Sequence, residues 1–392
     1  MKSQASPFIV NTVFTKVKKK RVKRLRGLDS PLYRATWPMM YIVRVFGFAP
    51  YNILQDRLVP SSINLIFTAI AAILYSYILY DVLKKLMNIQ REVSALSGTE
   101  NTKVIVNYSI VMYELSLTVF TRHSFVRIWN ALQDYDKGVR QLGHPRKEMW
   151  TAIVAWILVA VIASIWTSVN RSGMYAFHEA WHCNMGYLLP YVGTSIAIYK
   201  FVAMAIFLGQ RFRHLNAIAT KNLPSLSIAS KEIATISKKT ILSLHNDLMI
   251  AAENLESLYS LSLLFWIGSL SLHTVSNIYF IIEWILLKPW DTLALPLVYC
   301  MSTWLLAFLF QLLLLHVACD FASSQANSMG LILFEWQVRL MRKNEGFVEL
   351  SLQFLNRRLK FSAAGCFYVT LPLLRSIAST MATYLVILLQ FQ

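Results

Sequence analysis

The feature that most constrains this chain is a series of seven apolar stretches, each long enough to cross a lipid bilayer. A spanning helix needs about 20 mostly apolar residues. The overall composition agrees, because 56% hydrophobic residues and a mean hydropathy of +0.47 are too apolar for an ordinary soluble domain. The sequence therefore predicts an all-α membrane protein with seven transmembrane helices, at Ile63–Leu83, Val104–Thr121, Met149–Val169, Met185–Leu208, Leu258–Leu287, Leu293–Ala318 and Phe367–Phe391.

Basic residues are concentrated in alternate connections, and this asymmetry predicts the orientation in the membrane. Lysine and arginine favour the cytosolic side. They are frequent in the N-terminal tail and after the second, fourth and sixth stretches, whereas the connections after the third and fifth carry only Arg171 and Lys288. The connection after the first stretch is also basic and weakens the contrast. We expect a cytosolic N-terminus and an extracellular C-terminus, an order opposite to that of G-protein-coupled receptors.

The net charge of +18 could indicate a nucleic-acid partner, but the sequence offers no soluble basic domain to bind one. A basic run at Lys16–Arg26 lies next to the membrane domain, where it would contact anionic lipid. Trp37–Phe48 is apolar but too short to span, so we expect a re-entrant or interfacial helix there. We therefore predict membrane lipid, and no nucleic acid, as a partner of this end of the chain.

The last apolar stretch differs from the others because polar residues recur along one side of it. Pro372 and Arg375 are expected to break or kink it and to leave Ser376–Phe391 as a regular helix. Steps of three and four place hydroxyls and one amide on one face and aliphatic side chains on the other. Such a stripe is typical either of hydrogen bonding between membrane helices or of a pore wall with an apolar constriction at Ile387. The polar face comprises Ser376, Ser379 or Thr380, Thr383, Ile387 and Gln390, and the apolar face Ile377, Met381, Leu385 and Leu388.

The end of this stretch resembles a signature of insect gustatory receptors, which belong to the insect chemoreceptor superfamily. Thr383-Tyr384, five aliphatic residues and Gln390-Phe391 match the TYhhhhhQF pattern that closes the last helix in that family. The segment from Phe361 to Phe367, FSAAGCF, also resembles the family's sequence before that helix. The resemblance implies a ligand-gated cation channel, a tetramer of this chain or of it with other gustatory receptors, in the plasma membrane. Its pore and gate residues would be Thr380, Thr383, Ile387, Gln390 and Phe391.

The resemblance and the hydropathy together divide the chain into four parts. We expect a cytosolic basic tail with the re-entrant or interfacial helix (1–62), six transmembrane helices with a ligand pocket in their outer half (63–318), a cytosolic anchor (319–366) and a pore helix (367–392). Ser230–Ser257 and Asp320–Phe361 show helical spacing of apolar residues. Such helices either extend the spans into the cytosol or, as the family implies, pack into the anchor.

Polar and aromatic residues at compatible depths in the third to sixth stretches predict a small-molecule pocket. Aromatic walls with a few directed polar groups are typical of ligand sites. Each of these residues alone is also explained by interfacial anchoring or bundle packing. The ligand would be a tastant, either a sugar or a bitter compound. The predicted ligand-binding residues are Trp166, Asn170, Tyr187, Tyr191, His273, Asn277, Phe280, Trp284, Tyr299 and Trp304.

An HExxH string at residues 178–182 favours a different class of protein, an intramembrane zinc protease. On a helix, His178 and His182 would bind zinc on one face and Glu179 would act as general base. The string lies in a short outer connection, and no obvious third ligand follows it. We therefore predict no enzyme activity, no cofactor and no metal, and keep the protease as the alternative. Glu114 and Arg375 are intramembrane charges, which mark functional positions by default.

Overall fold

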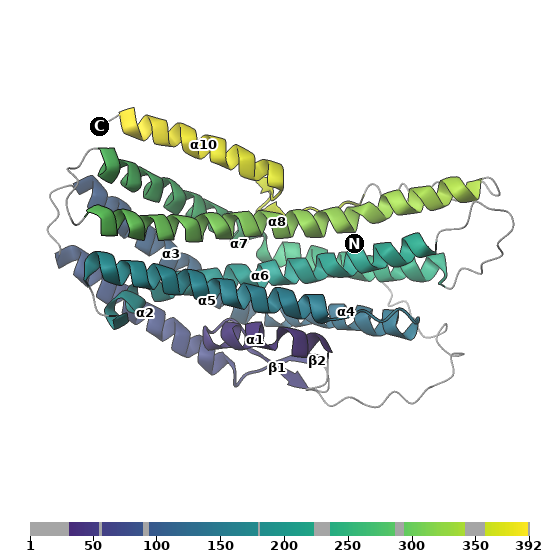
Figure 1. Cartoon of the computed structure of the whole chain (residues 1–392). Helices are drawn as coiled ribbons and strands as arrows, with labels where there is room; N and C mark the ends of the chain where they lie inside the picture. Colours follow the sequence, from purple (N-terminus) through teal and green to yellow (C-terminus); the bar gives the residue numbers. More distant parts are fainter. Residues whose placement is uncertain are drawn as a thin grey trace, which may run out of the picture.

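The computed structural model describes residues 31–54, 57–88, 94–178, 181–222, 236–286, 294–341 and 357–390. Long helices run alongside one another through the molecule (Figure 1). The basic tail and Phe391 lie outside these residues. The elements in chain order are α1 (Pro31–Val45), β1 (Tyr51–Leu54), β2 (Arg57–Pro60), α2 (Leu65–Asn88), α3 (Ser94–Phe120), α4 (Arg122–Gln141), α5 (Met149–Phe177), α6 (Trp181–Lys221), α7 (Lys238–Leu286), α8 (Ala294–Met341), β3 (Ser362–Ala363), β4 (Phe367–Tyr368) and α10 (Leu371–Gln390).

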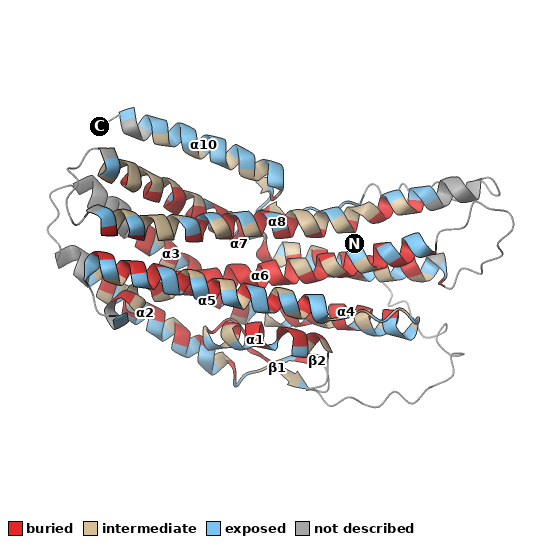
Figure 2. Cartoon of the chain, viewed as in Figure 1, coloured by how far each residue is buried: buried red, intermediate tan, exposed pale blue. Residues whose placement is uncertain are grey.

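Helix α6 forms the centre of the bundle. It packs against α3, α5, α7 and α8, and it appears as the most continuously buried helix in Figure 2. In the most apolar 18 residues of α6, 94% of the residues are buried, whereas the corresponding share is 28% in α2 and in α5. The difference follows from the sequence, because the small and apolar residues of α6 allow neighbours to approach on every side. At Gly209, for example, an added Cβ would lie 2.5 Å from a ring carbon of Phe321 on α8.

Six helices are long and apolar enough to cross a membrane: Leu65–Lys84, Thr102–Phe120, Met149–Phe177, Tyr187–Lys221, Lys239–Ile285 and Leu295–Glu335. They confirm six of the seven predicted spans. The seventh predicted span corresponds to a shorter apolar helix, Leu371–Ile387, so the count of seven stays a prediction. Isoleucines on α2 and α5, such as Ile70, Ile73 and Ile157, are exposed, as expected for side chains that face lipid.

The spans extend further than the sequence indicated. Helices α7 and α8 have 49 and 48 residues, and each continues without interruption from its apolar part into the polar region beyond it. No break occurs near residue 318, where we expected the anchor to begin. The described parts of the two amphipathic segments, 238–257 and 320–341, are therefore continuous with the spans, and the anchor stays a prediction. The extensions also pack together, because α7 lies along α8.

Two small hairpins modify the predicted all-α fold. Strand β1 pairs antiparallel with β2, and β3 with β4. Three residues, 364–366, connect β3 to β4; Ala364 and Gly365 have φ of 51° and 75°, and the Cys366 amide donates to the Ala363 carbonyl at 2.9 Å to close the turn. Hairpins this short carry little hydrophobic periodicity, so hydropathy alone does not reveal them. The second hairpin determines where the last helix begins.

The last helix, α10, begins at Leu371, five residues before the predicted start at Ser376. Pro372 is its second residue and produces no break, because the first turn of a helix has no partner for its N–H groups and tolerates proline. Arg375 then lies inside the helix. The predicted kink in this region was therefore wrong, and the polar and apolar faces extend over one helix of 20 residues.

Helix α4 and the end of α6 form a polar cluster at the end of the bundle that carries the basic connections. Arg211 is fully buried and donates a hydrogen bond to Asp136 of α4, while Arg146 donates to Gln210 at 2.5 Å. Burial raises the pKa of the Asp136 carboxyl, and the Arg211 guanidinium opposes that shift. These contacts place the basic segments before α5 and at the end of α6 on the same side, as the predicted topology requires.

Candidate functional site

Aromatic side chains from four helices meet in one cluster, which we call the aromatic cluster. Tyr191 of α6 lies at its centre, with ring centroids 4.9 Å from Trp304 of α8 and 5.4 Å from His273 of α7. The His273 ring stacks on Phe308 at 4.7 Å and 16°. Edge contacts between aromatic rings of this kind favour a fixed mutual arrangement. The members are Trp166, Tyr187, Tyr191, His273, Trp304 and Phe308.

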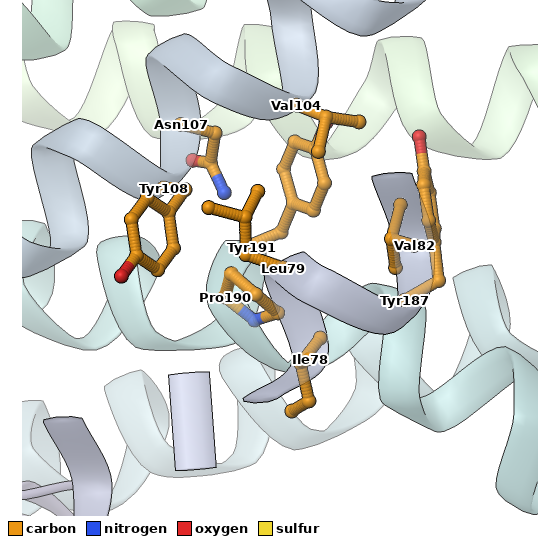
Figure 3. A pocket seen from close by; sticks show the side chains of 9 residues that line it. All are labelled: Ile78, Leu79, Val82, Val104, Asn107, Tyr108, Tyr187, Pro190 and Tyr191. Atoms are coloured by element: carbon orange, nitrogen blue, oxygen red, sulfur yellow. The ribbon is translucent and has the colours of Figure 1, made fainter. Parts of the chain in front are cut away.

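Two cavities adjoin the cluster, and Tyr191 lines both of them. The outer cavity, shown in Figure 3, lies between α2, α3 and α6, with the amide of Asn107 directed into a mainly apolar group. The inner cavity lies between α3, α6, α7 and α8 and is more polar. Each has room for about one water molecule, so a larger ligand requires side chains to move. The outer cavity is lined by Ile78, Leu79, Val82, Val104, Asn107, Tyr108, Tyr187, Pro190 and Tyr191, and the inner one by Asn107, Tyr191, Thr194, Ser195, Ile198, Trp266, Ser269, Leu270, His273, Phe308 and Gln311.

The structure brings five of the ten predicted ligand-binding residues into the aromatic cluster: Trp166, Tyr187, Tyr191, His273 and Trp304. Three of these, Tyr187, Tyr191 and His273, line a cavity. This arrangement is what a pocket requires, but no bound ligand tests it, so their role stays a prediction.

The other five predicted residues lie outside the cluster. Asn170 accepts a hydrogen bond from Asn184 at 2.8 Å and joins α5 to α6. Phe280 lies under the ammonium of Lys103 at 5.1 Å, and Asn277 is buried one turn away on α7. Trp284 is half-buried near the end of the same helix. Tyr299 is 54% exposed, because its position on α8 faces away from the side that carries Trp304.

Most residues that line the cavities were missed by sequence reasoning, and Asn107, Trp266 and Phe308 are three examples. Trp266 and Phe308 lie in long apolar helices that are buried on several sides, where no single periodicity selects a face. Phe308 is four residues after Trp304, however, and the spacing rule that selected the α7 residues predicts a shared face for this pair also. Asn107 could also have been selected from the sequence, because a polar amide within an apolar span is costly and marks a functional position by default.

The HExxH string does not form a helical zinc site. Helix α5 ends at Phe177, His178 adopts a left-handed conformation with φ of 50°, and α6 begins only at Trp181. The two histidines therefore do not share one face of one helix, and Glu179 lies outside the described residues. Within the described part of the chain, no group of three or more potential ligands is placed to hold a metal ion. The structure does not support the zinc protease.

Helix α10 carries two chemically different faces. Leu374, Ile377 and Met381 pack on the core formed with α7 and α8. Thr380 and Thr383 are exposed, and each donates a hydrogen bond to the backbone of its own helix. Figure 2 shows α10 as largely exposed at the edge of the bundle. Ile387 and Gln390 are exposed too, so the predicted pore face is uncovered in the single chain. Tyr384 of the TYhhhhhQF pattern is 59% exposed as well.

A short strap, residues 357–364, attaches this last helix to α7 and α8. Ser260 of α7 donates to the Ser362 carbonyl at 2.9 Å and accepts the Ala364 amide proton at 3.0 Å. Asn327 of α8 pairs with both main-chain groups of Leu359, at 2.8 and 3.0 Å. These hydrogen bonds attach the segment before α10 to both α7 and α8.

Comparisons with known proteins agree with this architecture. A sequence model described as 7tm chemosensory receptor matches residues 37–392, most of the chain. The chain belongs to the 7tm chemosensory receptor family. This membership confirms the resemblance to insect chemoreceptors that the last helix indicated, and together with the six long apolar helices it defines a multi-pass membrane protein.

Similar proteins include two from Drosophila melanogaster, each matched over about a third of its length. Putative gustatory receptor 2a is 30% identical over 157 residues, covering 34% of this chain and 36% of that protein. Gustatory receptor 68a is 31% identical over 152 residues, covering 36% of both chains.

The fold is similar to that of the insect olfactory receptor OR5 from Machilis hrabei. The structure of OR5 in complex with eugenol has a TM-score of 0.67 at 15% identity and covers 92% of this chain and 99% of that chain. A second structure of OR5 has a TM-score of 0.66 at 16% identity and covers 93% of this chain and 100% of that chain. This likeness establishes the fold shared by the two chains.

Proposed function

We propose that this chain is a subunit of a tastant-gated, non-selective cation channel in the plasma membrane. Four subunits, identical or combined with other gustatory receptors, would surround a pore lined by α10. The observation that carries the proposal is the pair of faces on α10, one packed on its own chain and the other uncovered and rich in hydroxyls. Family membership and the similarity to two gustatory receptors of Drosophila melanogaster support the taste ligand.

The gate would form where α10 helices approach one another at Ile387. A ring of aliphatic side chains can exclude ions by dewetting, without any charge. Thr380, Thr383 and Gln390 would offer hydroxyl and amide dipoles to a partly hydrated cation above and below that ring. Arg375 lies near the first turns of α10, away from the constriction, where its charge opposes cation flow least.

Opening would follow from ligand binding at the aromatic cluster. The ligand must displace side chains, because each cavity has room for only about one water molecule. If the displaced arrangement favours the open channel, binding shifts the closed–open equilibrium by the ligand's difference in affinity for the two states. Helix α7 carries that shift to α10, since it contributes His273 to the cluster and Ser260 to the strap.

The proposal predicts that Ile387→Ala raises current in the absence of any ligand. The shorter side chain widens the ring and allows it to fill with water. Whole-cell current is measured in cells that express only this chain, before and after a panel of sugars and bitter compounds, together with surface labelling. The matched control is Val386→Ala, which also shortens an exposed aliphatic residue but on a neighbouring face. Normal surface density with no basal current for Ile387→Ala would place the constriction elsewhere. Absence of ligand-evoked current from the unmodified chain, both alone and co-expressed with other gustatory receptors, would refute the channel.

A further inference from the structure

The inner cavity is lined by residues with buried polar atoms that have no hydrogen-bond partner. These atoms are Nδ2 of Asn107, Nε1 of Trp266 and Nε2 of His273. All three residues are at least 97% buried. The indole nitrogen of Trp266 is only ever a donor, so it can be satisfied only by an acceptor. Such groups are rare in folded proteins and carry a free-energy cost that a suitable ligand would remove.

Three other polar residues that line this cavity, Thr194, Ser195 and Gln311, already have hydrogen-bond partners. Ser195 donates to the amide oxygen of Gln311 at 2.8 Å, and the amide nitrogen of Gln311 donates to the carbonyl of Ala307. The hydroxyl of Thr194 donates to Oδ1 of Asn107 at 3.0 Å, which leaves Nδ2 of the same amide to donate to a ligand. A sugar brings a hydroxyl on nearly every carbon and would leave several of them buried without partners, which is costly.

The linings also exclude a charged ligand. Among the residues that the structure places around the two cavities, none is an aspartate, glutamate, lysine or arginine. Lys103 of α3 lies over the ring of Phe280, which is on the same face of α7 as His273, so it brings a positive charge close to the cavities. A protonated amine would therefore lose its hydration without gaining a carboxylate partner. This disfavours alkaloids in their protonated form.

The aromatic walls favour a flat ligand. In the inner cavity, His273 and Phe308 stack nearly parallel, at 16°, and Tyr191 meets the His273 ring at 69°, so the cavity offers ring faces and edges. Tyr191 and Asn107 line both cavities, so these two side chains lie between them. A ligand that occupied both cavities would have apolar groups of α2 on one side and the three unpartnered polar atoms on the other.

We propose that the ligand of this chain is an uncharged, planar compound that carries a carbonyl or ether oxygen, held by hydrogen bonds from Trp266, Asn107 and His273. The apolar part of the compound would lie against Tyr191 and the outer cavity. This inference rests on the proposed function for the location of the site, and it adds the chemical class that the site selects.

The test compares two probes of the same shape on the purified chain in detergent or nanodiscs. Coumarin is a neutral fused bicycle with a lactone, and naphthalene is a fused bicycle without any acceptor. Binding is measured by isothermal titration or by competition with a radiolabelled probe. Naphthalene is more hydrophobic, so tighter binding of coumarin can come only from its oxygens. We expect coumarin to bind at least tenfold tighter than naphthalene, and fructose not to compete with it.

The variant Trp266→Phe removes the donor and keeps a ring in place. It should weaken coumarin binding roughly three- to tenfold, the range for one hydrogen bond, and leave naphthalene binding unchanged. Trp156→Phe, the same substitution at a residue 53% exposed on α5, should change neither. Equal binding of the two probes by the unmodified chain, or no binding of coumarin, would overturn the proposal even if Trp266→Phe fails to fold.

The two proposals fail separately in this design. Selective coumarin binding without any evoked current would support the ligand class and refute the channel. Two results would support the channel and refute the ligand class. One is a current evoked by a tastant whose affinity is unchanged in Trp266→Phe, and the other is a current evoked by a sugar.

Discussion

Loss of the Asn327 side chain provides a quantitative test of how the strap is held. Asn327 donates to the Leu359 carbonyl at 3.0 Å and accepts the Leu359 amide proton at 2.8 Å. Leu359 itself is 2% exposed, so Asn327→Ala leaves two main-chain groups without partners and with little access to water. Each such group costs about 1–3 kcal/mol. Local relaxation recovers part of this, and we expect the strap to lose about 2–3 kcal/mol of local stability.

Amide hydrogen exchange of residues 357–364, followed by mass spectrometry in detergent, measures this loss directly. A loss of about 2–3 kcal/mol corresponds to roughly 30- to 150-fold faster exchange, since 1.4 kcal/mol is a factor of ten. The control is Asn52→Ala, which removes a hydrogen bond to Ile53 at an exposed site where water replaces it. Unchanged exchange of the strap in Asn327→Ala would show that the pairing contributes nothing and that α10 is attached by other contacts.

Two further predictions use matched pairs of positions. Gly209→Ala should lower the thermal midpoint of the solubilised protein, because its Cβ would lie 2.5 Å from Phe321 and overpacking costs about 1–3 kcal/mol. Gly268→Ala has open space around its Cβ and should keep or raise the midpoint. Equal midpoints for the two variants would refute the close packing of α6 on α8. Asp136→Ala should strongly reduce surface expression, because the fully buried guanidinium of Arg211 loses its ion-pair partner, which costs about 3–5 kcal/mol of stability. Asp134→Ala breaks an exposed ion pair and should have little effect. Normal expression of both variants would show that the buried pair is dispensable.

The positions of the six long helices were predictable from hydropathy, because lipid leaves few alternatives to an apolar helix. The elements outside the six long helices were harder to predict from the sequence. Helix α4 was not predicted, although Phe125, Trp129 and Leu132 recur at helical spacing and are buried. Its polar residues lower the mean hydropathy, so a search for spans passes over it. The start of α10 was misjudged for a different reason: a proline ends a helix only when it lies beyond the first turn.

The candidate site was predictable by residue type and less so by position. Tyr191, His273 and Trp304 meet because large aromatic side chains at one depth in neighbouring helices reach the same space. Asn170 was chosen on the same grounds but binds Asn184, a partner that only the packing of α5 on α6 reveals. The unpartnered indole of Trp266 could not have been predicted, since it depends on where every neighbouring donor and acceptor lies.

Helix α7 has a consequence for the speed and robustness of any signal between ligand and pore. Trp266 of the inner cavity and Ser260, which holds the strap, are six residues apart on one unbroken helix. At 1.5 Å per residue, they are separated by about 9 Å along the axis. No loop or hinge lies between these two residues, so a displacement of the Trp266 backbone and a displacement of the Ser260 backbone are movements of the same stiff segment of helix. Sequence drift in the connecting loops would leave this transmission intact, while one inserted residue between the two positions would rotate one by about 100° relative to the other and disconnect them.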